Sequence, residues 1–222
     1  MKALIKQCQT LVVVLCLSGF GGVQAAVDLE AGKALYGSCQ ACHGANGEGN
    51  PALQAPSLAG QFDWYLQRQL TFFKTGVRGA DANDQLGAQM RASVALLPDE
   101  QAVANVAAYL ASLSFAAVTN RINGDLRNGN NYYQSKCGAC HGGNAEGNTM
   151  INAPRLNGQD GNYLLRQYAN FQKGIRGVHP DDRYGKQMKM MSDSLPTEKD
   201  LNDVLAFVHS LPLVKEGKAG GH

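Results

Sequence analysis

The feature that most constrains this 222-residue chain is a five-residue motif that occurs twice. Cys39-Gln-Ala-Cys42-His43 and Cys137-Gly-Ala-Cys140-His141 share the spacing C-x-x-C-H and lie 98 residues apart. The same offset aligns the chain without a gap from Cys39 to Leu113, so the chain contains two copies of one unit. Further pairs at this offset are Pro56 and Pro154, Leu58 and Leu156, Gln61 and Gln159, Tyr65 and Tyr163, Arg78 and Arg176, and Met90 and Met188.

The alignment shifts by one residue just before the first cysteine of each motif. There the offset is 97, and it pairs Leu29 with Leu126, Gly32 with Gly129 and Tyr36 with Tyr133. One residue has therefore been gained or lost at this point.

The repeat predicts two domains of similar structure, which we place at residues 26–117 and 118–222. Each repeated unit has only ~90 residues, which is small for a self-sufficient core. We therefore expect a bound group to add buried apolar surface in each domain.

The first 25 residues have the pattern of a secretory signal peptide. Two lysines, Lys2 and Lys6, precede an apolar run from Leu11 to Leu17, and a small-residue cleavage site ends at Ala25. The alternative is an uncleaved anchor, but the apolar run is shorter than the ~20 residues of a membrane-spanning helix. We predict cleavage near Ala25 and export to the periplasm. Cleavage removes two of the six cysteines and leaves four in the mature chain.

Hydrophobic periodicity predicts an all-α fold. In each unit we expect a short helix from Leu29 or Leu126, a middle helix over about 64–74 or 162–173, and a final helix. The final helix is the clearest, since Val103, Val106 and Leu110 are spaced for one helical face and the second unit repeats the pattern. The stretch between the middle and final helices is predicted to be a glycine-rich loop, and no strand is expected.

The C-x-x-C-H motif is the attachment signal for haem c. The thiols of Cys39 and Cys42, and those of Cys137 and Cys140, can form thioethers to the two vinyl groups of a haem. The adjacent imidazoles of His43 and His141 can then bind iron. The alternatives are a redox dithiol, a disulfide and a zinc site. A redox dithiol does not require the histidine that follows it, and a structural zinc site needs four cysteine or histidine ligands. We predict two covalently bound haem c groups.

The repeat also indicates a sixth iron ligand. Met90 and Met188 are aligned, and each lies seven residues before the Leu-Pro pair that opens the final helix. A thioether suits reduced iron and raises the reduction potential, although a methionine often only fills a core. In the second unit Met190 and Met191 are alternatives to Met188 as the sixth ligand. His179 and His209 are alternative ligands there, which we expect to be surface or helix residues instead.

Two further pairs have candidate roles around a haem. A carbonyl in the segment of Pro56 or Pro154 could accept the second N–H of the iron-binding imidazole, or the proline could simply form a turn. Arg78 and Arg176 could pair with haem propionates, or they could be solvated loop residues.

At these residues the sequence resembles the class I cytochromes c, and within them the dihaem cytochrome c4 family. The resemblance rests on both C-x-x-C-H motifs, the Pro-x-Leu-x-Gly segments at 56–60 and 154–158, and Met90 and Met188. It implies two tandem class I cytochrome c domains that face each other, each wrapped around one covalent haem. It also implies His/Met ligation and periplasmic electron transfer towards a terminal oxidase.

Charge gives no reason to expect nucleic acid as a partner. Residues 26–117 hold five Lys and Arg against eight Asp and Glu, whereas residues 118–222 hold thirteen against ten. Such a dipole can steer encounters with redox partners, or it can be accidental.

We predict a non-enzymatic one-electron carrier whose partners are a respiratory complex, a terminal oxidase or a dehydrogenase. The carrier could also associate with the surface of a membrane. The alternatives are an electron-transfer subunit of a dehydrogenase and a dihaem peroxidase.

Overall fold

The structure, a computed structural model, describes residues 26–115 and 120–213. The predicted signal peptide, the expected domain boundary at 117 and 118 and the C-terminal tail lie outside these residues. Helices make up the regular structure of the described chain, and the pairs Asn50–Ala55 and Asn148–Ala153 form isolated bridges. The all-α prediction is confirmed.

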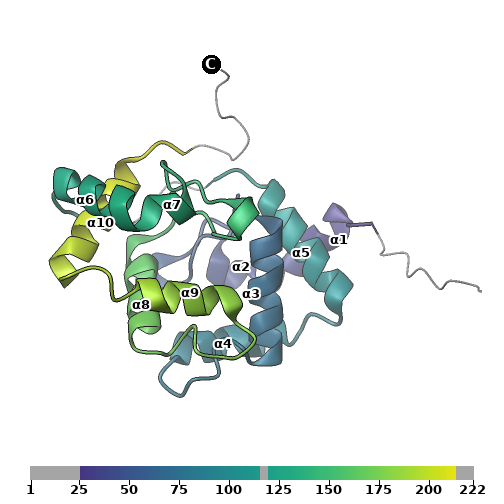
Figure 1. The fold of residues 1–222 in the computed structure, drawn as a ribbon. Helices are drawn as coiled ribbons and strands as arrows, with labels where there is room; N and C mark the ends of the chain where they lie inside the picture. Colours follow the sequence, from purple (N-terminus) through teal and green to yellow (C-terminus); the bar gives the residue numbers. More distant parts are fainter. Residues whose placement is uncertain (1–25, 116–119, 214–222) are drawn as a thin grey trace, which may run out of the picture.

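The two halves have the same order of helices, with one additional helical turn in the second half (Figure 1). The first half contains α1 (Leu29–Tyr36), α2 (Gln40–His43), η1 (Pro51–Leu53), α3 (Asp63–Thr75), α4 (Gln85–Val94) and α5 (Glu100–Ser112). The second contains α6 (Leu126–Tyr132), η2 (Tyr133–Cys137), α7 (Gly138–His141), η3 (Thr149–Ile151), α8 (Gly161–Gln172), α9 (Arg183–Met191) and α10 (Glu198–Ser210).

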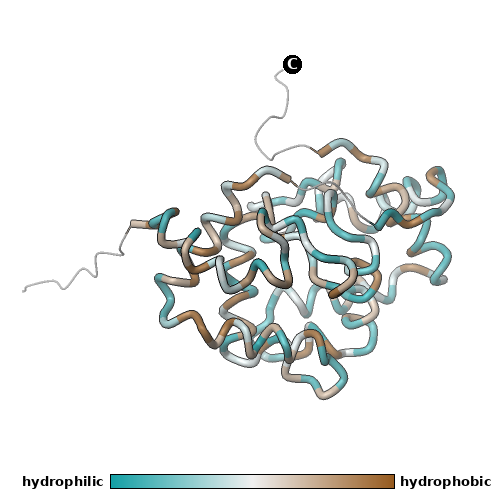
Figure 2. The backbone as a smooth tube through the Cα atoms, turned by 180° about the vertical axis from the view of Figure 1, so that it is seen from behind, coloured by the Kyte–Doolittle hydropathy of each residue, from teal (hydrophilic) through white to brown (hydrophobic). Residues whose placement is uncertain are grey.

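Each half has a hydrophobic core of its own. In the first, α1 and α3 pack on α5, whose Val106 and Leu110 are each 1% exposed. In the second, α6 and α8 pack on α10, whose Val208 is fully buried. Apolar and polar stretches alternate along the backbone, as expected of amphipathic helices around small cores (Figure 2). No helix of the described residues is long and apolar enough to span a membrane.

The aligned glycines Gly32 and Gly129 lie where the first and last helices of each half cross. A Cβ built on Gly32 would overlap the carbonyl oxygen of Asn105 in α5, and one on Gly129 would overlap that of Asp203 in α10. Glycine therefore lets the two backbones approach closely at both crossings.

The one-residue shift in the repeat has a structural explanation. Tyr36 and Cys39 are joined by a turn, whereas the segment from Tyr133 to Cys137 has one residue more and forms a single π-helical turn, η2. A π turn absorbs one extra residue within a helix. The insertion is thus accommodated in the turn that ends at the first cysteine of the second motif, and α7 follows directly.

The predicted glycine-rich loop between the middle and final helices is wrong in part, because it contains α4 and α9. Each of these helices begins at an aspartate whose carboxylate accepts an N–H three residues later, Asp84 from Gly87 and Asp182 from Gly185. Glycines at this position weaken the helical pattern in the sequence. A Cβ on Gly87 would overlap the carboxylate of Asp84, and one on Gly185 would overlap that of Asp182, so glycine leaves room for these caps.

Candidate haem-attachment sites

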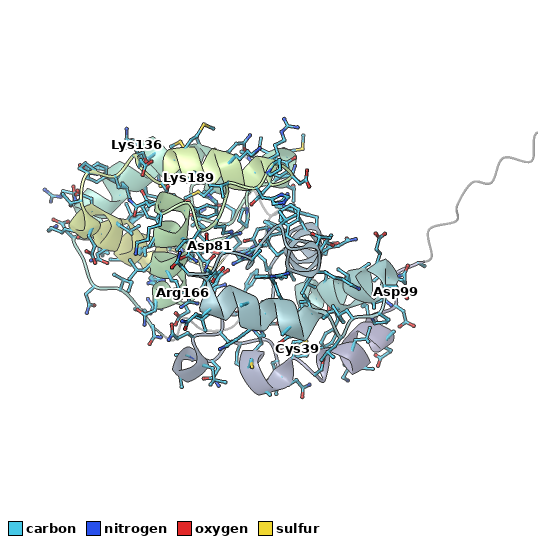
Figure 3. The ribbon with its side chains drawn as sticks, turned by 90° about the horizontal axis from the view of Figure 1, so that it is seen from below. Cys39, Asp81, Asp99, Lys136, Arg166 and Lys189 are labelled. Atoms are coloured by element: carbon cyan, nitrogen blue, oxygen red, sulfur yellow. The ribbon has the colours of Figure 1, made fainter. Side chains whose placement is uncertain are left out.

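Each C-x-x-C-H motif forms a one-turn helix, α2 or α7. Within α2 the N–H of His43 donates to the carbonyl of Cys39 at 2.9 Å, which places cysteine and histidine on successive turns of backbone. The four motif cysteines, which are those of the described residues, form no disulfide with one another; Cys39 and Cys137 are half-buried, whereas Cys42 and Cys140 are exposed. The two motifs lie on different sides of the molecule: Figure 3 shows Cys39 well separated from Lys136, the residue before Cys137.

Both motif histidines are oriented by a backbone carbonyl, as one of the two readings of the proline segments predicts. His43 Nδ1 lies 3.0 Å from the carbonyl oxygen of Pro56, and His141 Nδ1 lies 2.9 Å from that of Pro154. A carbonyl can only accept, so Nδ1 carries the proton and donates. The lone pair is therefore on Nε2, the atom that can bind a metal.

The protonation state of these histidines suits metal binding. Burial lowers the pKa of both imidazoles, and the hydrogen bonds to the proline carbonyls only partly oppose this. The neutral form, which alone can bind a metal through nitrogen, is thereby favoured at neutral pH.

Two buried tyrosines, which sequence reasoning did not single out, hold the ends of the motif helices. The hydroxyl of Tyr36 donates to the carbonyl of Gly44 at 2.6 Å, and that of Tyr133 donates to Gly142 at 2.6 Å. Both side chains are fully buried, and burial raises the pKa of each phenol. Their alignment at offset 97 was the signal in the sequence that could have found them.

The candidate methionine ligands lie on α4 and α9. Met90 is half-buried and packs against the first core, as Cys39 and Leu58 also do. Met188 is half-buried in the second half, whereas its competitors Met190 and Met191 are 71% and 39% exposed. The structure thus distinguishes the three methionines of α9 by their burial.

The alternative histidines have other surroundings. His209 is 4% exposed; its Nδ1 accepts from the N–H of Ile122 at 3.2 Å, and its Nε2 donates to the carbonyl of Gln159 at 3.1 Å. Both ring nitrogens are used, so His209 ties the chain before α6 to α10. Of the two positions expected for it, surface or helix, the structure shows a buried helix residue. His179 lies in a turn, where its Nδ1 accepts from the N–H of Asp181.

The arginines Arg78 and Arg176 lie between the two halves. Arg78 donates to Gln69 of its own half at 2.7 Å and to Gln167 of the other half at 2.8 Å. Arg176 donates to the same two glutamines, at 2.9 Å each. The network has an approximate twofold symmetry, because Gln69 and Gln167 are themselves aligned in the repeat. Arg78 is 8% exposed, so the reading of a solvated loop residue is wrong for it.

A second pair of arginines, from the middle helices, also joins the halves. Arg68 of α3 donates to the backbone carbonyl of Asn152 at 3.2 Å, and Arg166 of α8 donates to that of Gln54 at 2.8 Å. Figure 3 shows Arg166 between the two sides of the molecule. Because these contacts use residues aligned at offset 98, each half binds the other through the same surface.

The residues present fit a haem in each half. Half-buried apolar side chains pack against each core; they include Cys39, Leu58 and Met90 in the first half and Cys137 and Leu156 in the second. Near the interface, three buried donors have no hydrogen-bond partner among the described residues: Trp64 Nε1, Arg68 Nε and Arg176 Nε. Buried donors need acceptors, and the propionates of a haem are anionic acceptors.

Comparison with known proteins agrees with this arrangement. Residues 29–114 and 126–212 each match the family described as Cytochrome c. The chain is 30% identical to a cytochrome c4 of Azotobacter vinelandii, over 95% of this chain and 99% of that protein. It is 31% identical to a thiosulfate dehydrogenase electron acceptor of Stutzerimonas stutzeri (strain A1501), over 70% of this chain and 73% of that protein. The crystal structure of reduced recombinant cytochrome c4 from Pseudomonas stutzeri is similar with a TM-score of 0.68 at 29% identity, covering 84% of this chain and 100% of that one.

Proposed function

Because this chain belongs to the cytochrome c family, as a dihaem member similar to cytochrome c4, we propose that it carries electrons in the periplasm with one histidine and one methionine on each iron. It binds two haem c groups covalently, one in each domain. Each haem, when bound, supplies a one-electron couple. The proposed attachment residues are Cys39, Cys42, Cys137 and Cys140, and the proposed iron ligands are His43, Met90, His141 and Met188.

The observation that carries the proposal is the oriented histidine that follows each pair of thiols. The hydrogen bonds to Pro56 and Pro154 fix the ring and leave Nε2 unprotonated. Such a bond also makes the imidazole a better donor to a metal. Exposed Cys42 and Cys140 leave one edge of each motif open to solvent, where a redox partner could approach.

The methionines complete the proposed ligand set. A thioether stabilises reduced iron, and a ligand on both sides of the iron leaves no position for a substrate. The burial of Met188 compared with Met190 and Met191 supports Met188 as the ligand of the second domain. A saturated site is suited to electron transfer rather than to peroxidase chemistry.

The partners that we propose are other redox proteins. One relative is named as the electron acceptor of a thiosulfate dehydrogenase, which supports a dehydrogenase as one source of electrons. A terminal oxidase is the proposed destination. The excess of acidic residues in the first domain and of basic residues in the second would orient the carrier on partners of opposite charge.

The function can be tested on the protein purified from a periplasmic fraction. We expect a pyridine haemochrome assay to give two haems per chain, and we expect the oxidised protein to bind cyanide slowly. Fast cyanide binding or fast turnover of peroxide at one haem would contradict a saturated carrier and favour a peroxidase. Electron transfer from a purified dehydrogenase, measured at low and high salt, tests the proposed steering, because screening should slow it.

A further inference from the structure

One peptide group connects the iron-binding histidine of the first domain to the second domain. The carbonyl of Pro56 and the N–H of Ser57 belong to the same planar peptide. The carbonyl accepts from His43 Nδ1 at 3.0 Å, and the N–H donates to Oε1 of Gln159 at 2.9 Å. The amide of Gln159 is held in place, since its Oε1 also accepts from Asp160 N at 3.0 Å and its Nε2 donates to the Ser57 carbonyl at 2.9 Å.

The second domain has the same arrangement in the opposite direction. The carbonyl of Pro154 accepts from His141 Nδ1 at 2.9 Å, and the N–H of Arg155 donates to Oε1 of Gln61 at 3.2 Å. Gln61 is held in the same way, by Phe62 N at 3.1 Å and by the carbonyl of Arg155 at 3.0 Å. Each glutamine thus binds two N–H groups with its oxygen and one carbonyl with its nitrogen, which fixes the orientation of the amide.

These contacts involve the backbone of the partner residue rather than its side chain. Ser57 and Arg155 are aligned in the repeat but differ in size and charge, whereas Gln61 and Gln159 are the same residue. The side chain at the first position can vary because its backbone N–H and carbonyl make both contacts. The glutamine cannot vary in the same way, since both ends of its amide are used.

A peptide that donates through its N–H becomes a better acceptor at its carbonyl, because hydrogen bonds in a chain polarise one another. A better acceptor draws the Nδ1 proton of the histidine more strongly and makes the ring a stronger donor to iron. A stronger donor stabilises oxidised iron and lowers the reduction potential.

We propose that Gln61 and Gln159 are positioning residues that act across the domain interface, each tuning the iron-binding histidine of the other domain through one peptide group. The inference rests on the proposed function, in which His43 and His141 bind the irons. It predicts a crossed effect: Gln159 tunes the first haem and Gln61 tunes the second.

The test uses the full-length dihaem protein with the variants Gln61→Met and Gln159→Met, which keep the length of the side chain and remove its hydrogen bonds. Proton NMR during a redox titration follows each haem through its own ring-methyl signals, assigned to a domain by contacts with residues of that domain. We expect Gln159→Met to raise the potential of the first haem, and Gln61→Met that of the second. A threefold change in the redox equilibrium is the expected size, about 30 mV at 59 mV per tenfold.

Tyr65→Phe and Tyr163→Phe serve as matched controls. Each removes a hydrogen bond between the domains, to Arg176 at 3.2 Å or to Arg78 at 3.1 Å, without a contact to either peptide group. We expect these variants to leave both potentials unchanged. The same crossed shifts in the controls would overturn the proposal.

Three outcomes of the glutamine variants would also overturn it: no shift, a shift at the haem of the same domain, or equal shifts at both haems. An opened interface would produce equal shifts, so the crossed pattern separates tuning from a loss of packing. A failure of the proposed function has a different signature, because the wild-type protein would then lack two haems or would lack histidine on iron.

Discussion

The hydroxyl of Tyr36 donates a 2.6 Å hydrogen bond to the carbonyl of Gly44, the residue that directly follows His43, the proposed iron ligand, in the chain. The tyrosine is fully buried and belongs to α1, so it ties the end of the motif helix to the first helix of the domain. Tyr133 and Gly142 repeat the contact in the second domain.

We therefore expect Tyr36→Phe to lower the free energy of unfolding by about 1–3 kcal/mol, the cost of leaving a buried carbonyl without its partner. Tyr109→Phe is the control, since the ring of Tyr109 packs on Tyr36 at 5.8 Å. Denaturant unfolding of the two variants checks the prediction. Equal stability of Tyr36→Phe and the wild type would show that the hydrogen bond contributes nothing.

Acid should lower the stability of the second domain through one buried carboxylate, whereas the aligned residue of the first domain carries no charge. Buried Asp203 accepts from Asp125 N at 2.9 Å, from Asn128 at 2.8 Å and from Lys199 at 2.6 Å. These hydrogen bonds, with that of Lys199 the strongest cause, lower the pKa of the carboxyl from 3.8 to about 2. Because the folded pKa lies below the unfolded one, the contribution is complete above about pH 4 and is lost as the pH falls towards 2.

Asp203→Asn should lower the free energy of unfolding at pH 7 by about 1.5–3 kcal/mol, the range for hydrogen bonds to a charged group. At pH 2 most of this difference should be lost, because the carboxyl of the folded wild type is then about half protonated. The aligned residue of the first domain is Asn105, which accepts from Asp28 N at 3.0 Å without a charge. Thermal unfolding of both proteins from pH 7 to pH 2 checks this, and a difference that does not depend on pH would refute the assignment to Asp203.

The close crossing of α1 and α5 gives a third prediction. Gly32→Ala would force a methyl group against the carbonyl of Asn105, so we expect a loss of about 1–3 kcal/mol, typical of overpacking. Gly143→Ala is the matched control, because a Cβ there would have open space. If the melting temperatures of the two variants fell equally, the crossing would not be the reason for glycine at position 32.

Much of the fold and the site could be predicted from the sequence, because the information is local. The C-x-x-C-H motifs indicate attachment and ligation through residue types and spacing alone. The final helices follow from the spacing of Val103, Val106 and Leu110. α4 and α9 were missed because Gly87 and Gly185, which leave room for the capping carboxylates of Asp84 and Asp182, weaken the local signal.

The interface could not be predicted, although its residues were visible as repeated pairs. The offset of 98 shows that Gln61 and Gln159 recur, but recurrence alone is equally explained by a role inside each domain. That the glutamines bind across the interface depends on how two separate cores pack together. The π turn at Tyr133–Cys137 is an intermediate case: the inserted residue was predicted, and its conformation was not.

The central claim is that each domain holds its iron between one histidine and one particular methionine. The most direct measurement is the weak far-red absorption band of sulfur bound to oxidised iron, recorded for Met90→Leu, Met188→Leu and the control Met190→Leu. We predict that the first two variants each lose about half of the band, the share of one of two irons in a His/Met site, and that the control keeps all of it. A full band in Met188→Leu, or a halved band in Met190→Leu, would contradict the claim.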